Sequence, residues 1–109
     1  MIEIKIFRDA QGAAAGLCSI GHAEYGESGK DIVCAAVSAL ELNLANSVAE
    51  FTDARFSCQI NENTGGFEFR LIDTGNKDAA LLLSSCLLGL EAVHREYGSN
   101  YLIITDQEV

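Results

Sequence analysis

Residues 32–51 read IVCAAVSALELNLANSVAEF, and they contain neither glycine nor proline. Asp31, which precedes them, is a residue type that favours the N-cap of a helix. The apolar side chains that recur at helical spacing are Val33, Val37, Leu40, Leu44 and Val48. The pattern predicts a helix over 32–51 that turns one long apolar side toward a core.

On the N-terminal side of this helix the sequence predicts a β-hairpin. Ile2, Ile4 and Ile6 alternate with other side chains, which is typical of a strand with one buried face. The stretch DAQG at 9–12 has turn chemistry, and residues 14–22 are a plausible second strand.

On the C-terminal side the sequence predicts two strands, a helix and a last strand, over residues 54–60, 67–72, 77–97 and 101–105. The turn NENTGG joins the first two strands, and Gly98 ends the helix at its C′ position. No linker or repeat divides the chain. The order ββαββαβ therefore predicts a single domain over 1–109 of the α+β class, with one mainly antiparallel sheet and two helices packed on it.

The predicted helix 77–97 is apolar on more than one side. Its leucines cannot all point at one sheet: they are Leu81, Leu82, Leu83, Leu87, Leu88 and Leu90. A helix that is apolar nearly all round is buried on two sides. We expect another subunit, in a homodimer, to bury the second apolar side of this helix. Helix-on-helix packing within one chain is the alternative.

The composition excludes several classes of partner. With 7 basic and 16 acidic residues the formal net charge is −9, which repels a phosphate backbone and favours basic partners. The longest apolar run, 79–90, is about half of what a bilayer requires, so we expect neither nucleic acid nor a membrane as a partner. The charges at 3 and 5 interrupt the unbroken apolar stretch of a signal peptide, and we expect a cytoplasmic protein.

Four cysteines, Cys18, Cys34, Cys58 and Cys86, form no CxxC pair. In the cytoplasm thiols stay reduced, so we expect four thiols rather than the two disulfides that a secreted domain could form. We interpret Cys58 and Cys86 as core thiols. A zinc site from Cys18, His22 and Cys34 is a weaker alternative because paired ligand spacing is missing. We expect no metal and no organic cofactor.

His22 and Cys34 are the residue types of a cysteine nucleophile and its base. If Asp31 is the N-cap, Cys34 is the third helical residue, close to N–H groups without intrahelical acceptors. The helix dipole favours a thiolate by about 1 kcal/mol, too little to ionise a thiol of pKa about 8.5 at pH 7. An imidazolium beside the sulfur can supply the rest, and His22 at the end of the preceding strand is the candidate.

Asp31, Cys34 and Ser38 are three and four residues apart, so they share one face of the helix. Asp31 can cap the helix or orient the imidazole, and Ser38 can hydrogen-bond the thiolate, the substrate or the backbone. Ordinary packing and capping are the alternative for each of these residues, and spacing alone leaves both interpretations open.

The stretch 23–30 contains Gly26 and Gly29 and few apolar side chains, which is typical of a mobile loop. We expect this loop to close on an extended substrate, with the two glycines as hinges. Tyr25 is a candidate substrate contact, and an ordinary surface tyrosine is the alternative.

The segment Gly21-His22-Ala23, then Gly29, then DIVCAAVS at 31–38, closely resembles the signature of the bacterial ribosomal-processing cysteine protease Prp family. The resemblance extends over the whole chain in length and in the order of elements. Gly21 and Ala23, which flank the histidine, are accordingly candidates for substrate binding or loop motion.

The resemblance implies a cysteine endopeptidase whose His/Cys pair falls on His22 and Cys34, with supporting roles for Asp31 and Ser38. It implies as substrate the N-terminally extended precursor of ribosomal large-subunit protein twenty-seven, cut after an aromatic residue. It also implies a homodimer. Two other functions stay open: a non-catalytic acidic dimer that binds a basic ribosomal protein during ribosome assembly, and a thiol hydrolase acting on another amide or a thioester.

Overall fold

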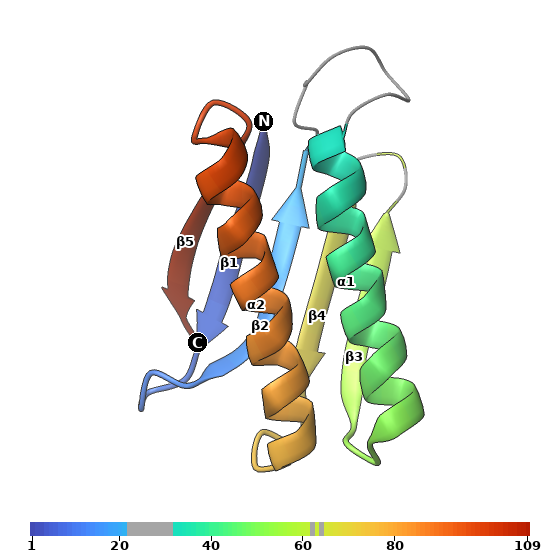
Figure 1. Ribbon diagram of the computed structural model, residues 1–109. Helices are drawn as coiled ribbons and strands as arrows, with labels where there is room; N and C mark the ends of the chain where they lie inside the picture. The colour runs from blue at the N-terminus through green and yellow to red at the C-terminus, as the bar shows by residue number, and fades with distance from the viewer. Residues whose placement is uncertain (22–31, 62, 64) are drawn as a thin grey trace.

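In a computed structural model that describes residues 1–21, 32–61, 63 and 65–109, the described chain forms five strands and two helices (Figure 1). The strands are β1 (Ile2–Arg8), β2 (Ala14–Ile20), β3 (Phe56–Asn61), β4 (Gly66–Leu71) and β5 (Leu102–Glu108). The helices are α1 (Ile32–Phe51) and α2 (Lys77–Tyr97). This is the predicted order, and both helices have the predicted bounds.

The strands form one sheet in the order β3-β4-β2-β1-β5. The pairs β1/β2, β2/β4 and β3/β4 are antiparallel, and only β1/β5 is parallel within the described sheet. The predicted mainly antiparallel α+β sheet is therefore confirmed. The strand ends differ from the prediction: β3 starts at residue 56 rather than 54, and β5 continues to 108 rather than 105.

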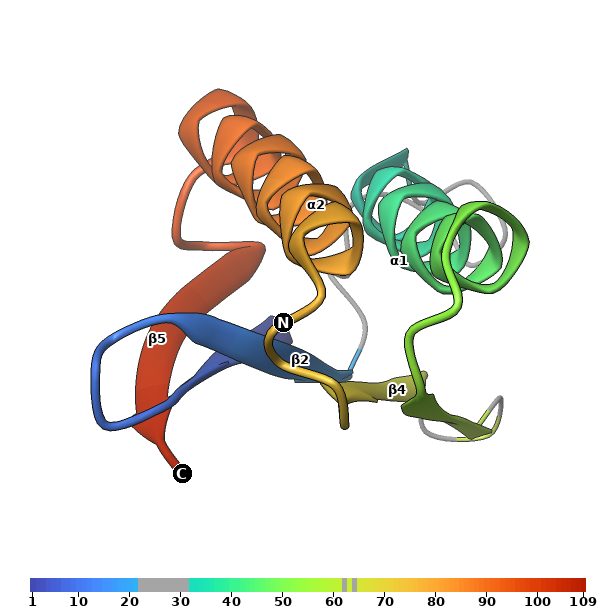
Figure 2. The same cartoon turned by 90° about the horizontal axis from the view of Figure 1, so that it is seen from below.

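Both helices lie side by side on the same face of the sheet, as the edge-on view shows (Figure 2). The core between the layers combines alternate strand side chains with one face of each helix. Among its members are Ile2, Ile4, Ile6, Leu17, Phe67, Phe69, Leu71, Val33, Val37, Leu44, Val48, Leu83, Leu87 and Leu90. By length and composition α1 could also cross a membrane, a test that the core helix of a globular protein passes equally.

The buried face of α1 includes one residue that the apolar pattern did not predict, although Leu40 packs against the core as expected. Glu41 is only 4% exposed and faces the sheet, whereas Leu40 is half-buried beside α2. A Cβ at Gly89 of α2 would approach the Leu40 side chain to 2.8 Å, so the helices are close there. Helix-on-helix packing thus covers part of the apolar surface of α2, but Leu81 and Leu88 stay 69% and 65% exposed.

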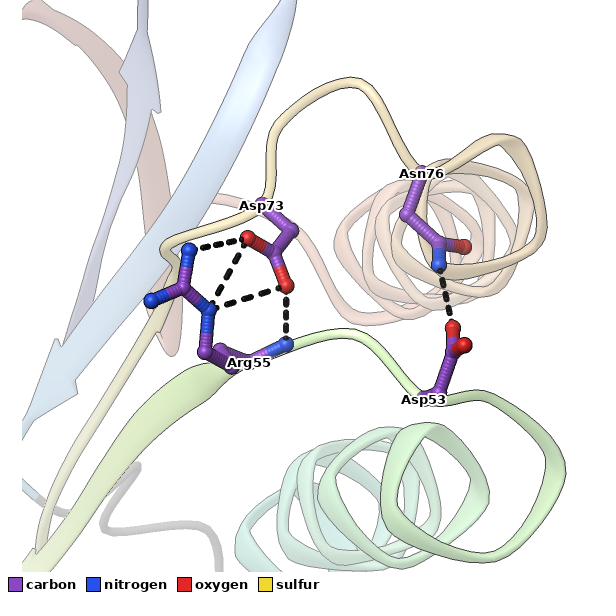
Figure 3. A network of polar contacts seen from close by, with 4 residues as sticks. All are labelled: Asp53, Arg55, Asp73 and Asn76. Atoms are coloured by element: carbon purple, nitrogen blue, oxygen red, sulfur yellow. Dashed lines mark hydrogen bonds and ion pairs between the residues drawn. The ribbon is translucent and has the colours of Figure 1, made fainter.

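Polar contacts tie together the end of the molecule where α1 finishes and α2 begins (Figure 3). The Arg55 guanidinium donates to Asp73 at 2.8 Å, and the Arg55 backbone N–H donates to the same carboxylate at 2.7 Å. These hydrogen bonds hold the pKa of Asp73 below its usual value. Asn76 accepts from the Ala79 N–H at 3.0 Å, which caps α2, and donates to Asp53 at 3.2 Å.

Candidate active site

A cavity of about 390 Å³ opens at the other end of the molecule, where α1 begins. Its lining comes from β1, β2, α1 and the hairpin of β3 and β4, and includes the apolar side chains of Ile2, Val37, Leu42, Ile60 and Phe67. The polar side chains that reach it include Cys34, Ser38, Ser19 and Glu41. Thiol, hydroxyl and carboxyl side chains thus face a cavity whose other lining residues are mainly apolar.

Cys34 is the third residue of α1, as predicted, and it lines the cavity in a half-buried position. The first turn lies at the positive end of the helix dipole, which favours an anion or a developing oxyanion there. Ser38 follows one turn later on the same face, is exposed and lines the same cavity. The predicted shared face of these two residues is confirmed.

Gly21 brings the end of β2 to this cavity. Its φ of +95° lies in the region that favours glycine, and a Cβ there would lie 2.4 Å from the carbonyl oxygen of Met1. Only glycine fits this position without moving the chain. Gly21, which precedes His22 in the sequence, and Cys34 therefore line the same cavity.

The remaining predicted site residues lie outside the described part of the chain. They are His22, Ala23, Tyr25, Gly26, Gly29 and Asp31. Their roles as base, cap, hinge or substrate contact stay predictions.

Cys18 does not share the cavity of Cys34. It lies between the helix-facing residues Leu17 and Ser19 of β2, so it points to the opposite face of the sheet, beside Lys5 and Glu68. The zinc alternative therefore loses one of its ligands. Within the described residues no group of three His, Cys, Asp or Glu side chains is placed to hold a metal ion.

Three of the four thiols are disfavoured as nucleophiles. Burial, and secondarily the charge of Glu68, raises the pKa of Cys18. Burial together with the charge of Glu41 raises the pKa of Cys58, and raises that of Cys86 to about 12. Cys86 is buried and Cys58 packs against the core, in keeping with their interpretation as core thiols. Cys34 is the thiol that lies at a helix N-terminus.

Sequence reasoning missed a buried polar pair in the cavity. The Ser19 hydroxyl donates to the Glu41 carboxyl at 2.5 Å, and each residue is only 4% exposed. Burial raises the pKa of Glu41 to about 7, and the hydrogen bond from Ser19 opposes this rise. A signal was present: Glu41 follows Val37 by four residues and precedes Leu44 by three, which places it on the buried face.

The chain is similar to known proteins over almost its whole length. A family model described as cysteine protease Prp matches residues 1–102. A ribosomal processing cysteine protease Prp of Staphylococcus aureus is 35% identical over 100 residues, which are 92% of this chain and 94% of that protein. The protein of that name from Bacillus subtilis is 28% identical over 110 residues, 97% of this chain and 98% of its own.

Solved structures agree with these matches. The S. aureus Prp with a covalently linked product peptide has a TM-score of 0.91 and 33% identity, covering 98% of this chain and 100% of that chain. The same enzyme with a substrate peptide has a TM-score of 0.87 and 31% identity over the same shares. The similarity includes the sheet and the helix that carries Cys34.

Proposed function

Since this chain belongs to the cysteine protease Prp family and is a cysteine peptidase, we propose that Cys34 is its nucleophile and His22 its general acid and base. The observation that carries this proposal is the cavity at the start of α1. Cys34, Ser38 and Gly21, the neighbour of His22, all line it.

The proposed reaction is hydrolysis of a peptide bond through an acyl-enzyme. The Cys34 thiolate attacks the scissile carbonyl, and N–H groups of the first turn of α1 stabilise the oxyanion. His22 gives a proton to the departing amine, then takes one from the water that releases the acyl group from sulfur. Ser38 hydrogen-bonds the thiolate or the substrate, and Asp31 caps the helix or orients the imidazole. These steps require no metal and no organic cofactor.

The proposed substrate is the N-terminally extended precursor of ribosomal large-subunit protein twenty-seven, cut after an aromatic residue. Three observations support a ribosomal protein as the substrate. The relatives are named ribosomal processing proteases, and the S. aureus enzyme has been solved with a substrate peptide. The net charge of −9 also complements a basic protein.

We propose further that the protein acts as a homodimer in the cytoplasm. The exposed Leu81 and Leu88 on the outer side of α2 support a second subunit, because solvent-exposed leucines on one helix face favour association. Sedimentation equilibrium measures the oligomeric state directly, and a monomer at all concentrations would contradict this proposal.

The test of the chemistry compares two cysteine variants on the extended precursor. Cys34→Ala should abolish cleavage, because the proposed acyl-enzyme forms on the Cys34 sulfur. Cys18→Ala is the matched control and should keep the wild-type rate, since this thiol lies on the opposite face of the sheet. Mass spectrometry of the products identifies the bond that is cut.

Turnover by Cys34→Ala would place the chemistry elsewhere. Saturable binding of the precursor by the wild type without any cleavage would favour the non-catalytic assembly module instead.

A further inference from the structure

We infer that Ser19 and Glu41 are positioning residues for the proposed nucleophile: their buried hydrogen bond holds α1 at one setting on β2 and so fixes where the Cys34 sulfur lies in the cavity. This inference rests on the proposed function of Cys34. The role acts through the helix that carries Cys34 and not through a side chain of the substrate.

The hydrogen bond joins two elements that border the cavity. Ser19 lies two residues before Gly21, which follows β2 and lines the cavity. Glu41 lies seven residues after Cys34, about two turns along the same face of α1. The Ser19 hydroxyl donates to Oε2 of Glu41 at 2.5 Å, and both residues are 4% exposed. A shift of α1 along β2 therefore moves Cys34 and breaks this hydrogen bond at the same time.

The hydrogen bond restrains α1 in a way that its apolar neighbours do not. Val37 and Leu44, about one turn before and after Glu41 on the buried face, pack in the core. Apolar contacts have no preferred direction, so they penalise a small slide of the helix weakly. A hydrogen bond has a narrow range of distances and angles, and leaving its groups unpaired in a buried position is costly. The pair thus defines one setting of α1 among those that apolar packing tolerates.

Stability alone does not explain a carboxyl at this position. The other buried residues of α1 are apolar: Val33, Val37, Leu44 and Val48. Burial raises the pKa of Glu41 to about 7, so the folded state disfavours the charged carboxylate. Replacing a buried polar or charged pair by apolar residues of similar volume is often neutral or stabilising. Placement of Cys34 is a role that accounts for the polar pair.

Ionisation of Glu41 should weaken this placement. The described titratable groups that face it are the thiols of Cys58 on β3 and Cys86 on α2, whose raised pKa values keep them neutral near pH 7. The charged side chains of β4 point to the opposite face of the sheet. In the described part of the chain, no basic side chain contributes to the pKa shift of Glu41. The carboxylate therefore favours settings of α1 in which water reaches it.

The experiment measures kcat on the extended precursor and urea unfolding for the same variants. Ser19→Ala combined with Glu41→Leu removes both polar partners, so neither is left buried alone. We expect kcat to fall about ten- to a hundredfold, the effect of misplacing a reacting group by about 1 Å, while resistance to urea is unchanged or higher. Val48→Ala is the matched control on the same buried face, about four turns from Cys34. It should lower resistance to urea and keep kcat.

Glu41→Gln is the conservative variant, because its side-chain oxygen can still accept from Ser19 but cannot ionise. At about pH 6 its kcat should stay within about threefold of the wild-type value, since both proteins then have a neutral group at this position. The ratio of its kcat to that of the wild type should rise at least about threefold between about pH 6 and pH 8. Titration of the nucleophile and its base cancels in this ratio, which isolates the contribution of Glu41.

An undiminished kcat in the double variant, an equal fall in Val48→Ala, or a kcat ratio that does not change with pH would overturn the inference. Alkylation of Cys34 by iodoacetamide, followed by peptide mapping, separates this result from failure of the proposed function. If the wild type cuts nothing but the pH dependence of Cys34 alkylation shifts in the double variant and not in Glu41→Gln, the pair positions the sulfur and only the peptidase proposal fails. Identical alkylation in all variants would overturn the positioning itself.

Discussion

Gly21 shows how a single backbone position fixes the geometry of the cavity. Its φ is +95°, and a Cβ would lie 2.4 Å from the Met1 carbonyl oxygen. Gly12, in the turn between β1 and β2, has a similar φ of +84° but has nothing within 4 Å of the same position. Both glycines have a positive φ that favours glycine, but only at Gly21 would a side chain also clash with a neighbouring part of the chain.

We therefore predict that Gly21→Ala destabilises the protein more than Gly12→Ala does. The conformational cost of alanine in this region is about 1–2 kcal/mol and applies to both variants. Gly21→Ala must in addition displace the chain at Met1, and because His22 follows it, kcat/KM for the precursor should fall as well. Urea unfolding and precursor cleavage measure the two effects. Equal losses in both variants would mean that the N-terminus moves aside freely.

The residue scale also shows why part of the site could be predicted from the sequence. Cys34 and Ser38 reach one cavity because helical spacing is local and can be counted along the chain. The pair of Ser19 and Glu41 joins residues 22 positions apart, and it forms only once α1 packs on β2. A helical pattern alone favoured the apolar Leu40 for the buried face, since nothing local indicates a partner for a buried carboxyl.

Among the elements, α2 depends on a cap that also joins it to the end of α1. Asn76 accepts from the Ala79 N–H and donates to Asp53 (Figure 3). We predict that Asn76→Ala lowers the free energy of unfolding by about 1 kcal/mol, because the cap hydrogen bond is lost. Thermal and urea unfolding measure this change.

Asp53→Ala is the control for the capping prediction, since it removes the link to Asn76 and leaves the cap in place. We expect it to cost less than Asn76→Ala, because the hydrogen bond is exposed. Equal losses of unfolding free energy in the two variants would show that the hydrogen bond between Asn76 and Asp53, and not the helix cap, stabilises this end of the molecule.

Element bounds were predictable where local signals mark them. Both helices run as expected because α1 contains neither glycine nor proline and Gly98 ends α2. The last strand was predicted too short because residues 106–108 are polar. Parallel pairing with β1 extends β5 through them, and Arg8 forms an ion pair with Asp106 at 3.0 Å. The C-terminal end of β5 is thus set by its pairing with β1, which cannot be predicted from the local sequence pattern.

For the molecule as a whole, opposite pKa shifts set the pH range of greatest stability. The pKa of Asp73 is lowered by its hydrogen bonds to Arg55, so the stability it contributes is present at neutral pH and is lost as pH falls through the folded-state value. The pKa of Glu41 is raised to about 7, so its contribution is present in acid and is lost as pH rises through that value. We therefore expect maximal stability on the acid side of pH 7.

Of these two groups, Glu41 is expected to cause the larger change in the free energy of unfolding with pH. A rise of its pKa from 4.5 to about 7 corresponds to about 3 kcal/mol of stability lost between pH 4.5 and pH 8, because the unfolded chain releases this proton more readily than the folded one. Urea unfolding across this range measures the slope. Glu41→Gln, which cannot ionise, should remove most of the slope and be more stable than the wild type at pH 8. The same slope in both proteins would mean that other groups cause it, and that the Glu41 carboxyl ionises in the folded state as easily as in water.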